Sequence, residues 1–183
     1  MAKLFLNYKI LNGIFFYIAW YACIYGASLD FELLGVAIGV ILIALHFLIS
    51  KKRRSDLIFL GAFLTIGFLG DWLLISQHVL AYPIITFDIT TLGVPLWILT
   101  IYASFSTTIN HSAIFLHKHP VWCSIGGGIG GAVSYYLAAK IGAILLPLGW
   151  ISLTAIAIYW LLILLFSKWL HDLLEKTIYE NSK

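Results

Sequence analysis

The chain consists of long apolar runs that are interrupted by short polar or glycine- and proline-containing segments. A helix needs about 20 residues, at 1.5 Å each, to cross about 30 Å of hydrocarbon. Six runs reach that length: 4–27, 31–50, 57–80, 92–116, 121–139 and 144–170. They lack the alternation of polar and apolar positions that a membrane barrel requires. The pattern predicts an all-α polytopic membrane protein, with six transmembrane helices in one bundle that forms a single domain over residues 1–183.

Composition narrows the class of protein further. The chain is 62% hydrophobic and only 10% charged, and its mean hydropathy is +0.99. A soluble domain has about 25% charged residues, because its surface faces water. A soluble enzyme, a nucleic-acid-binding module and a disordered regulator are therefore excluded.

The positively charged residues predict the orientation. If the N-terminus is cytoplasmic and six spans follow, ten of the eleven Lys and Arg residues fall on the cytoplasmic side, and only Lys140 falls outside. Basic loops resist translocation, so this asymmetry favours a cytoplasmic location for both termini. The first apolar segment lacks a short core followed by a small-residue cleavage site, and we interpret it as a retained helix and not as a signal peptide.

Asp71 is the charged residue nearest the middle of a predicted span. Charged groups are costly in hydrocarbon and often mark function. On the helix, Gly67, Asp71 and His78 share one face, and Gly67 permits close approach of a neighbouring helix. A proton-handling or ligand-binding carboxylate and a structural ion pair or hydrogen bond, for instance with Lys140, both remain open.

The fourth predicted span carries a polar stripe. Thr100, Ser104, Thr107 and His111 recur at spacings of four, three and four, and Asn110 lies beside the last of them. Such a stripe should face the bundle or a wet cavity. The hydroxyl groups are also explained by interhelical hydrogen bonds that fix the packing, at about 0.6 kcal/mol each.

Two further polar residues lie at a similar predicted depth. His46 is near the cytoplasmic end of the second span, and Asn12 is in the cytoplasmic half of the first. With Asn110 and His111 they suggest a polar intramembrane pocket, with Asp71 above it. The deeper tryptophans, Trp72 and Trp97, either line such a pocket or serve as packing. The candidate pocket residues are Asp71, His46, Asn110, His111, Asn12, Ser104, Thr107 and His78.

The glycine-rich fifth span indicates close helix packing. Gly127, Gly131 and Ser134 lie on one small-residue stripe, and with Gly67 they form the predicted packing set. A phosphate-binding loop is a poor alternative, because no strand precedes the glycines and no Lys-Ser/Thr follows them.

Several types of active site are not expected, because the residue motifs that they require are absent. The scattered histidines do not form a di-iron desaturase motif, and no Gly-x-Ser-x-Gly elbow is present for a serine hydrolase. No cofactor and no metal are predicted, and a b-type haem held between His46 and His111 is a minor alternative.

Short motifs distributed over nearly the whole chain carry a family resemblance. They are Asn12 and Trp20, His46, Gly67 with Gly70-Asp71, Pro95-Leu96-Trp97, the run from Phe105 to Asn110 followed by Ser112, and the run from Gly130 to Tyr136. The chain resembles a family of small bacterial inner-membrane proteins catalogued as domain of unknown function 2878. The resemblance implies no activity and no catalytic residues. Genes of this family often lie beside those of cyclopropane-fatty-acid-synthase-like enzymes, which implies a lipid-related role by association.

The function expected from these observations is the binding of a lipid, fatty-acyl group or small amphiphile in the polar pocket, in a catalytic or accessory role in envelope lipid metabolism. Asp71 would be the proton acceptor or headgroup partner, and His46, Asn110 and His111 would hydrogen-bond the ligand. The expected partners are membrane lipids and possible membrane proteins, with no nucleic acid. The alternatives are a carrier, such as the substrate-binding component of an uptake transporter with an ATPase partner, and a purely structural subunit.

Overall fold

The computed structural model describes residues 2–83 and 93–179, and the side chains of residues 8–83 and 93–177. This part of the chain is all-helical, as predicted, and its one pairing of extended residues is an isolated bridge between Ala81 and Leu145. The helices are α1 (Ala2–Ser28), α2 (Glu32–Ile49), α3 (Arg53–Ser76), α4 (Leu96–Ser106), α5 (Pro120–Lys140) and α6 (Trp150–Leu174), with a 3₁₀ turn η1 (Ile114–His117) and a π-helical turn η2 (Glu175–Tyr179).

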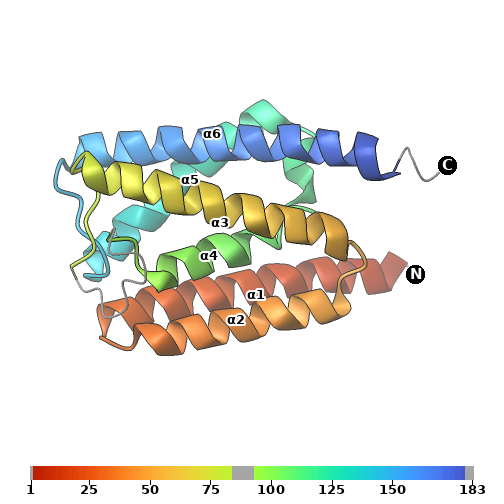
Figure 1. Ribbon diagram of the computed structural model, residues 1–183, viewed down its shortest axis with the longest axis horizontal. Coiled ribbons are helices and arrows are strands. Elements are labelled where there is room, and N and C mark those ends of the chain that lie inside the picture. Colours follow the sequence, from red (N-terminus) through yellow and green to blue (C-terminus); the bar gives the residue numbers. More distant parts are fainter. Residues whose placement is uncertain (1, 84–92, 180–183) are drawn as a thin grey trace.

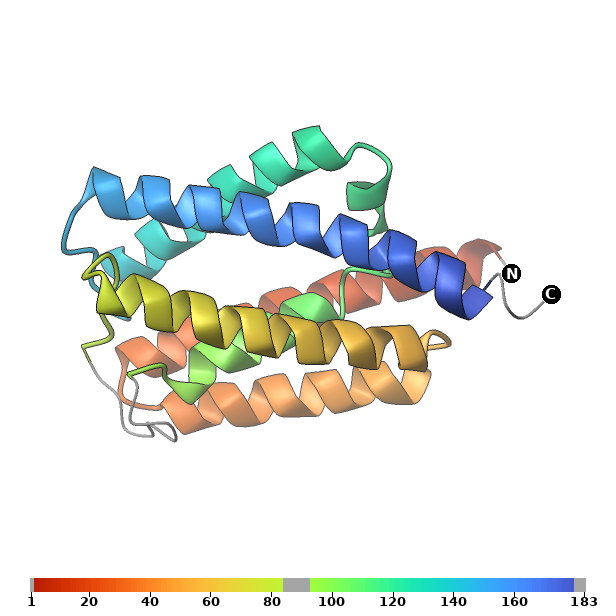
Figure 2. The same cartoon turned by 45° about the horizontal axis from the view of Figure 1, so that its top comes forward.

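The helices pack in two groups joined through α3 and α4 (Figures 1 and 2). Helices α1 and α2 form one antiparallel pair, and α5 and α6 form another. Helix α4 packs against α1, α2 and α3, and α3 also contacts α6. The start of α1, the α2–α3 connection, η1 and the end of α6 lie at the same end of the bundle (Figure 1), which we call the basic end because the α2–α3 connection and the first turn of α3 together carry the run from Lys51 to Arg54.

Within the described residues, four helices are long and apolar enough to cross a membrane: α1, α2, α3 and α6, the last together with the turn that follows it. Their outward faces are apolar, since Leu48 is 70% exposed and Trp150 is 82% exposed, whereas Asn12, Asp56 and Asp71 are completely buried. Buried polar groups inside an apolar exterior are the arrangement expected in lipid and not in water. These helices identify a membrane protein.

The prediction of a single helix over the fourth span, 92–116, is wrong. Helix α4 ends at Ser106, and the chain then forms a series of turns until η1 begins. The hydroxyls of Ser106, Thr107 and Thr108 each donate to the backbone carbonyl three residues earlier, at 2.7 Å. Such local bonds compete with the helical ladder. The predicted polar stripe is therefore divided, with Thr100 and Ser104 on the helix and Thr107 and His111 on the turns that follow it.

Two other helix boundaries differ from those predicted, and both bear on the site. Helix α3 begins at Arg53 and not at residue 57, which places Asp56 in its first turn. It ends at Ser76, so His78 follows the helix, with a φ of 55° and an exposed side chain, and does not share a face with Asp71. Helix α6 begins at Trp150 and not at residue 144, directly after Gly149, whose φ is 56°.

Candidate functional site

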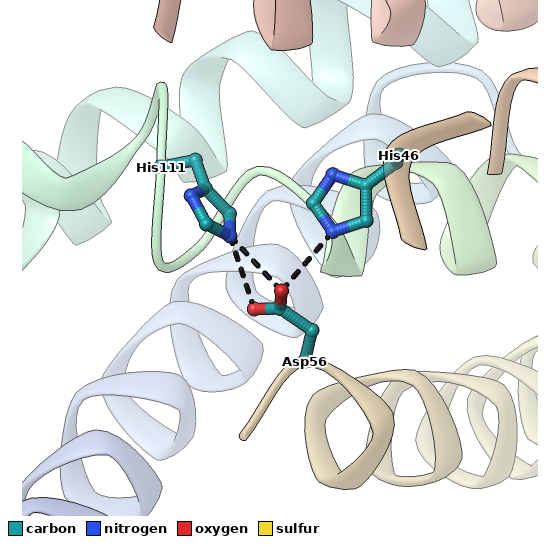
Figure 3. Close-up of side chains that lie close together, drawn as sticks. All are labelled: His46, Asp56 and His111. Carbon is teal, nitrogen blue, oxygen red and sulfur yellow. Dashed lines mark hydrogen bonds and ion pairs between the residues drawn. The ribbon is translucent and has the colours of Figure 1, made fainter. Parts of the chain in front are cut away.

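A polar cluster lies at the basic end of the bundle around the carboxylate of Asp56. His46 comes from the last turn of α2, Asp56 from the first turn of α3, and His111 from the turns after α4. Figure 3 shows both imidazole rings directing a nitrogen at the carboxylate. We call Asp56, His46, His111, Ser50 and Asn110 the histidine cluster; all five side chains are buried.

The Asp56 carboxylate is surrounded by groups that can donate hydrogen bonds. His46 Nε2 lies 3.2 Å from Oδ2 and His111 Nε2 lies 3.0 Å from the same oxygen. Asn110 Nδ2 donates to Oδ1 at 2.9 Å, and the Ser50 hydroxyl donates to Oδ2. Ionised carboxylates offer about four acceptor positions. The four partners fill them, which explains how a completely buried carboxylate is tolerated.

The orientation of Asn12 fixes the tautomer of His46. Asn12 Oδ1 accepts from the hydroxyl of Ser112 at 2.7 Å, and its Nδ2 donates to the carbonyl of Thr107 at 3.3 Å. The same Nδ2 lies 3.1 Å from His46 Nδ1. Because an amide nitrogen can only donate, Nδ1 of His46 accepts, and the ring proton is on Nε2. His46 therefore donates to Asp56.

A second carboxylate cluster surrounds Asp71, farther along α3. Tyr102 donates to Oδ1 at 2.9 Å, Tyr135 donates to the same oxygen at 3.3 Å, and Tyr82 donates to Oδ2. The hydroxyls of Tyr102 and Tyr135 also contact each other at 3.2 Å. We call Asp71, Tyr82, Tyr102 and Tyr135 the tyrosine cluster. Burial, and then the charge of Asp71, raises the pKa of Tyr82 well above its ordinary value, so its phenol remains a donor.

The single pocket expected from the sequence is corrected to two separate clusters. His46, Asn110 and His111 meet around Asp56, with Asn12 bonded to His46. Asp71 is absent from this group, since its partners are tyrosines. The two carboxylates are 15 positions apart on one helix, which is roughly 22 Å at 1.5 Å per residue. The suggested ion pair with Lys140 is also wrong, because Lys140 Nζ lies over the ring of Tyr136, 5.3 Å from its centroid.

The remaining candidate pocket residues lie outside both clusters. Thr107 contributes its carbonyl to Asn12, and its hydroxyl bonds to Ser104. Ser104 is buried, and its own hydroxyl has no hydrogen-bond partner among the described residues. His78 is exposed. None of these side chains contacts Asp56 or Asp71 directly in the described part of the structure.

A hollow in the described bundle is largely apolar and is lined by neither carboxylate, although Tyr135 of the tyrosine cluster lines it. A cleft of about 420 Å³ runs between α1 and α4 on one side and α5 and α6 on the other. Aromatic rings form much of its wall, among them Phe16, Trp20, Trp97, Phe105 and Trp160. Trp97 was one of the two tryptophans considered for a pocket wall, whereas the other, Trp72, is 42% exposed.

The small residues of α5 allow α6 to pack closely and leave room for the cleft. A Cβ atom on Gly127 would lie 2.0 Å from a Leu164 methyl carbon, and one on Gly131 would lie 2.5 Å from the ring of Trp160. Gly128, outside the predicted stripe, meets the backbone carbonyl of Ala157 at 2.7 Å by the same measure. Ser134 lines the cleft. On α3, a Cβ atom on Gly67 would lie 2.5 Å from the ring of Tyr102.

The haem alternative does not fit this arrangement. The rings of His46 and His111 have centroids 5.0 Å apart at an angle of 74°, and both Nε2 atoms face the carboxylate of Asp56. A porphyrin plane would have to occupy the position of that carboxylate.

One of the comparisons with known proteins identifies a family. The model of the family described as protein of unknown function (DUF2878) matches residues 9–166. No curated protein and no solved structure matches the chain. The match covers both carboxylates of α3 and the residues that surround them. The chain belongs to the DUF2878 family, as its motifs suggested.

Proposed function

We propose that this membrane protein binds the acyl chain of a lipid, a fatty acid or a similar amphiphile in the apolar cleft, in a catalytic or accessory role in envelope lipid metabolism. The cleft itself carries this proposal. Its volume of about 420 Å³ lies within the range of about 300–1,000 Å³ that is typical of small-molecule sites. Its wall is predominantly aromatic and aliphatic, which suits a hydrocarbon chain.

The residues at the mouth of the cleft support the proposal that the ligand enters from the bilayer. Tyr17 and Tyr21 of α1 and Leu137 of α5 line the cleft and are 61%, 53% and 48% exposed. They lie on helices whose outer faces are apolar. An acyl chain can therefore pass between α1 and α5 without crossing a polar surface.

The indole side chains of two residues in the wall carry hydrogen-bond donors that are not used within the described part of the protein. Nε1 of Trp97 and Nε1 of Trp160 are buried and have no acceptor among the described residues. A buried donor without a partner costs about 1–3 kcal/mol. Rotation of either ring toward the cleft would bring its donor to a carboxylate, ester or phosphate oxygen of an amphiphile, which a plain hydrocarbon lacks.

The proposed location is the bacterial inner membrane, with six spans and both termini cytoplasmic. The support is the charge of the basic end, where four consecutive Lys and Arg residues of the α2–α3 connection and the first turn of α3 lie at the same end of the bundle as the start of α1 and the end of α6. Positively charged segments are retained on the cytoplasmic side.

Native mass spectrometry of the gently extracted protein tests the proposal. We expect a retained lipid or fatty acid on the wild-type protein and at least a fivefold lower retained fraction on Gly130→Leu. Gly130 lines the cleft, and a Cβ atom there meets nothing within 4 Å, so the larger side chain fills the cleft without a clash at its base.

Gly126→Leu is the matched control. Gly126 lies one turn earlier on α5, a Cβ atom there is equally free, and the residue does not line the cleft. Equal lipid retention by both variants would contradict the proposal. A water-soluble small molecule in place of lipid, with a co-purified ATPase, would instead support the carrier alternative.

A further inference from the structure

The histidine cluster contains three metal-ligating side chains that converge from separate parts of the chain. His46, Asp56 and His111 each present one ligand atom, and these atoms lie within 4.8 Å of one another. The three side chains are 1%, 0% and 7% exposed. Two imidazoles and one carboxylate are a recurring donor set of zinc enzymes and of non-haem iron centres.

The distances between these atoms match the distances between ligands around a metal ion. Bonds of 2.0–2.1 Å to zinc, at tetrahedral angles, place neighbouring ligand atoms about 3.3 Å apart. The two histidine Nε2 atoms lie 3.2 and 3.0 Å from Asp56 Oδ2. Only small side-chain shifts are needed to admit an ion.

Stability alone does not account for this cluster. Replacement of a buried ion pair by well-packed apolar residues is often neutral or stabilising. The neighbouring tyrosine cluster shows that this fold buries a carboxylate with neutral hydroxyls alone. Two histidines on one carboxylate therefore indicate a role beyond the satisfaction of its charge.

We propose that His46, Asp56 and His111 bind one divalent transition-metal ion of the zinc or ferrous type. The ion is held by Nε2 of each histidine and by the carboxylate, and Ser50 and Asn110 continue to donate to the carboxylate from outside the coordination sphere. Three protein ligands leave a position for water or substrate, as in catalytic zinc sites.

Metal binding requires a change of tautomer at His46. The proton leaves Nε2 and a proton is taken up at Nδ1, so the ring remains neutral. Tyr8 Oη lies 3.0 Å from Nδ1 and can accept a hydrogen bond from the new Nδ1–H group, as second-shell partners of metal-bound histidines do. Asn12 must then rotate its amide, and it gives up its bonds to the Thr107 carbonyl and the Ser112 amide, which are both 3.3 Å long.

The test uses the full-length protein in detergent, stripped with a chelator and then titrated with Zn²⁺ or Co²⁺ alone. We expect one ion per chain by elemental analysis after desalting, and at least a tenfold loss of affinity in His46→Gln and in His111→Gln. His78→Gln is the control, because His78 is exposed and outside the cluster. X-ray absorption of the cobalt-loaded wild-type protein should show two imidazole ligands, and this reading does not depend on any variant folding.

Less than about one-tenth of an ion per wild-type chain would overturn the proposal. Unchanged affinity in both histidine variants, or an absorption spectrum without imidazole scattering, would also overturn it. These measurements detect only the bound metal, so their outcome is independent of lipid retention in the cleft.

Discussion

Helix α3 carries two completely buried carboxylates whose surroundings differ in one chemical respect. Asp56 accepts from the histidine cluster at the basic end, and Asp71 accepts from the tyrosine cluster toward the opposite end of the same helix. Asp56 has four hydrogen-bond partners and Asp71 has three. The difference lies in whether their partners can reverse the direction of a bond.

The partners of Asp71 are hydroxyl groups, which both donate and accept. Two partners of Asp56 are fixed donors: the Asn110 amide nitrogen and His46 Nε2, whose proton is held there by Asn12. The tyrosine cluster can therefore adapt to a change in its central group by rotation of hydroxyl groups, whereas the histidine cluster can adapt only if Asn12 gives up hydrogen bonds.

Asp56→Asn should have the largest effect. The new amide nitrogen would face donor groups, and the removal of one partner from a buried charged network costs about 3–5 kcal/mol. We expect a large drop in the melting temperature of the metal-free protein in detergent, measured by differential scanning fluorimetry. A drop no larger than that of Asp71→Asn would contradict the contrast.

Asp71→Asn should have a smaller effect. The tyrosine hydroxyls can rotate to accept from the new amide, which leaves the loss of charge-assisted bonds, about 1–2 kcal/mol. The same thermal measurement checks it, with Tyr102→Phe as a companion that removes one of the donors. Aggregation of the Asp71→Asn protein under conditions in which the Asp56→Asn protein remains folded would contradict the contrast.

The coupling between Asn12 and Asp56 should be smaller again. In an Asn12→Leu background His46 is free to change tautomer, so Asp56→Asn should cost about 1 kcal/mol less than it does in the wild-type background. Asp71→Asn should cost the same in both backgrounds, to within about 0.5 kcal/mol, because Asn12 and Asp71 share no partner. A double-mutant cycle at each carboxylate provides the measurement.

The smallest effect concerns acid sensitivity at the basic end. Burial, and then the neighbouring His171, lowers the pKa of His117 to about 4. The unfolded chain binds this proton near pH 6.5, so the contribution of His117 to stability is complete above that pH and decreases as the pH falls toward 4. His117→Gln should reduce the loss of melting temperature between pH 7.5 and pH 5 by a few degrees. An unchanged loss would assign the acid sensitivity to other groups.

The sequence predicted three of the five members of the histidine cluster and one of the four members of the tyrosine cluster, for identifiable reasons. Equal depth from the membrane edge was enough to group Asn12, His46, Asn110 and His111, because helix rise converts position directly into depth. Asp56 was missed, because it follows the run from Lys51 to Ser55, which has the composition of a solvated loop. Its available signal was its place directly before the apolar run that begins at Leu57, where an acidic residue often begins a helix.

The tyrosine cluster was missed because its members come from unrelated elements. Nothing in the sequence links Tyr82, Tyr102 or Tyr135 to Asp71. Side-chain direction on different helices depends on their packing, which periodicity within one helix does not specify. For the same reason, the short hydroxyl run from Ser106 to Thr108 did not disclose that it would end α4.

The tautomer of His46 tests the central contrast most directly, and ¹⁵N NMR of histidine-labelled, metal-free protein in nanodiscs reports it. We predict a protonated Nε2 and an unprotonated Nδ1 at His46 near pH 7.5, assigned by comparison with His46→Gln, and the reverse after zinc is added. A protonated Nδ1 in the metal-free protein would show that Asn12 does not fix the ring, and the contrast between the two clusters would then fail.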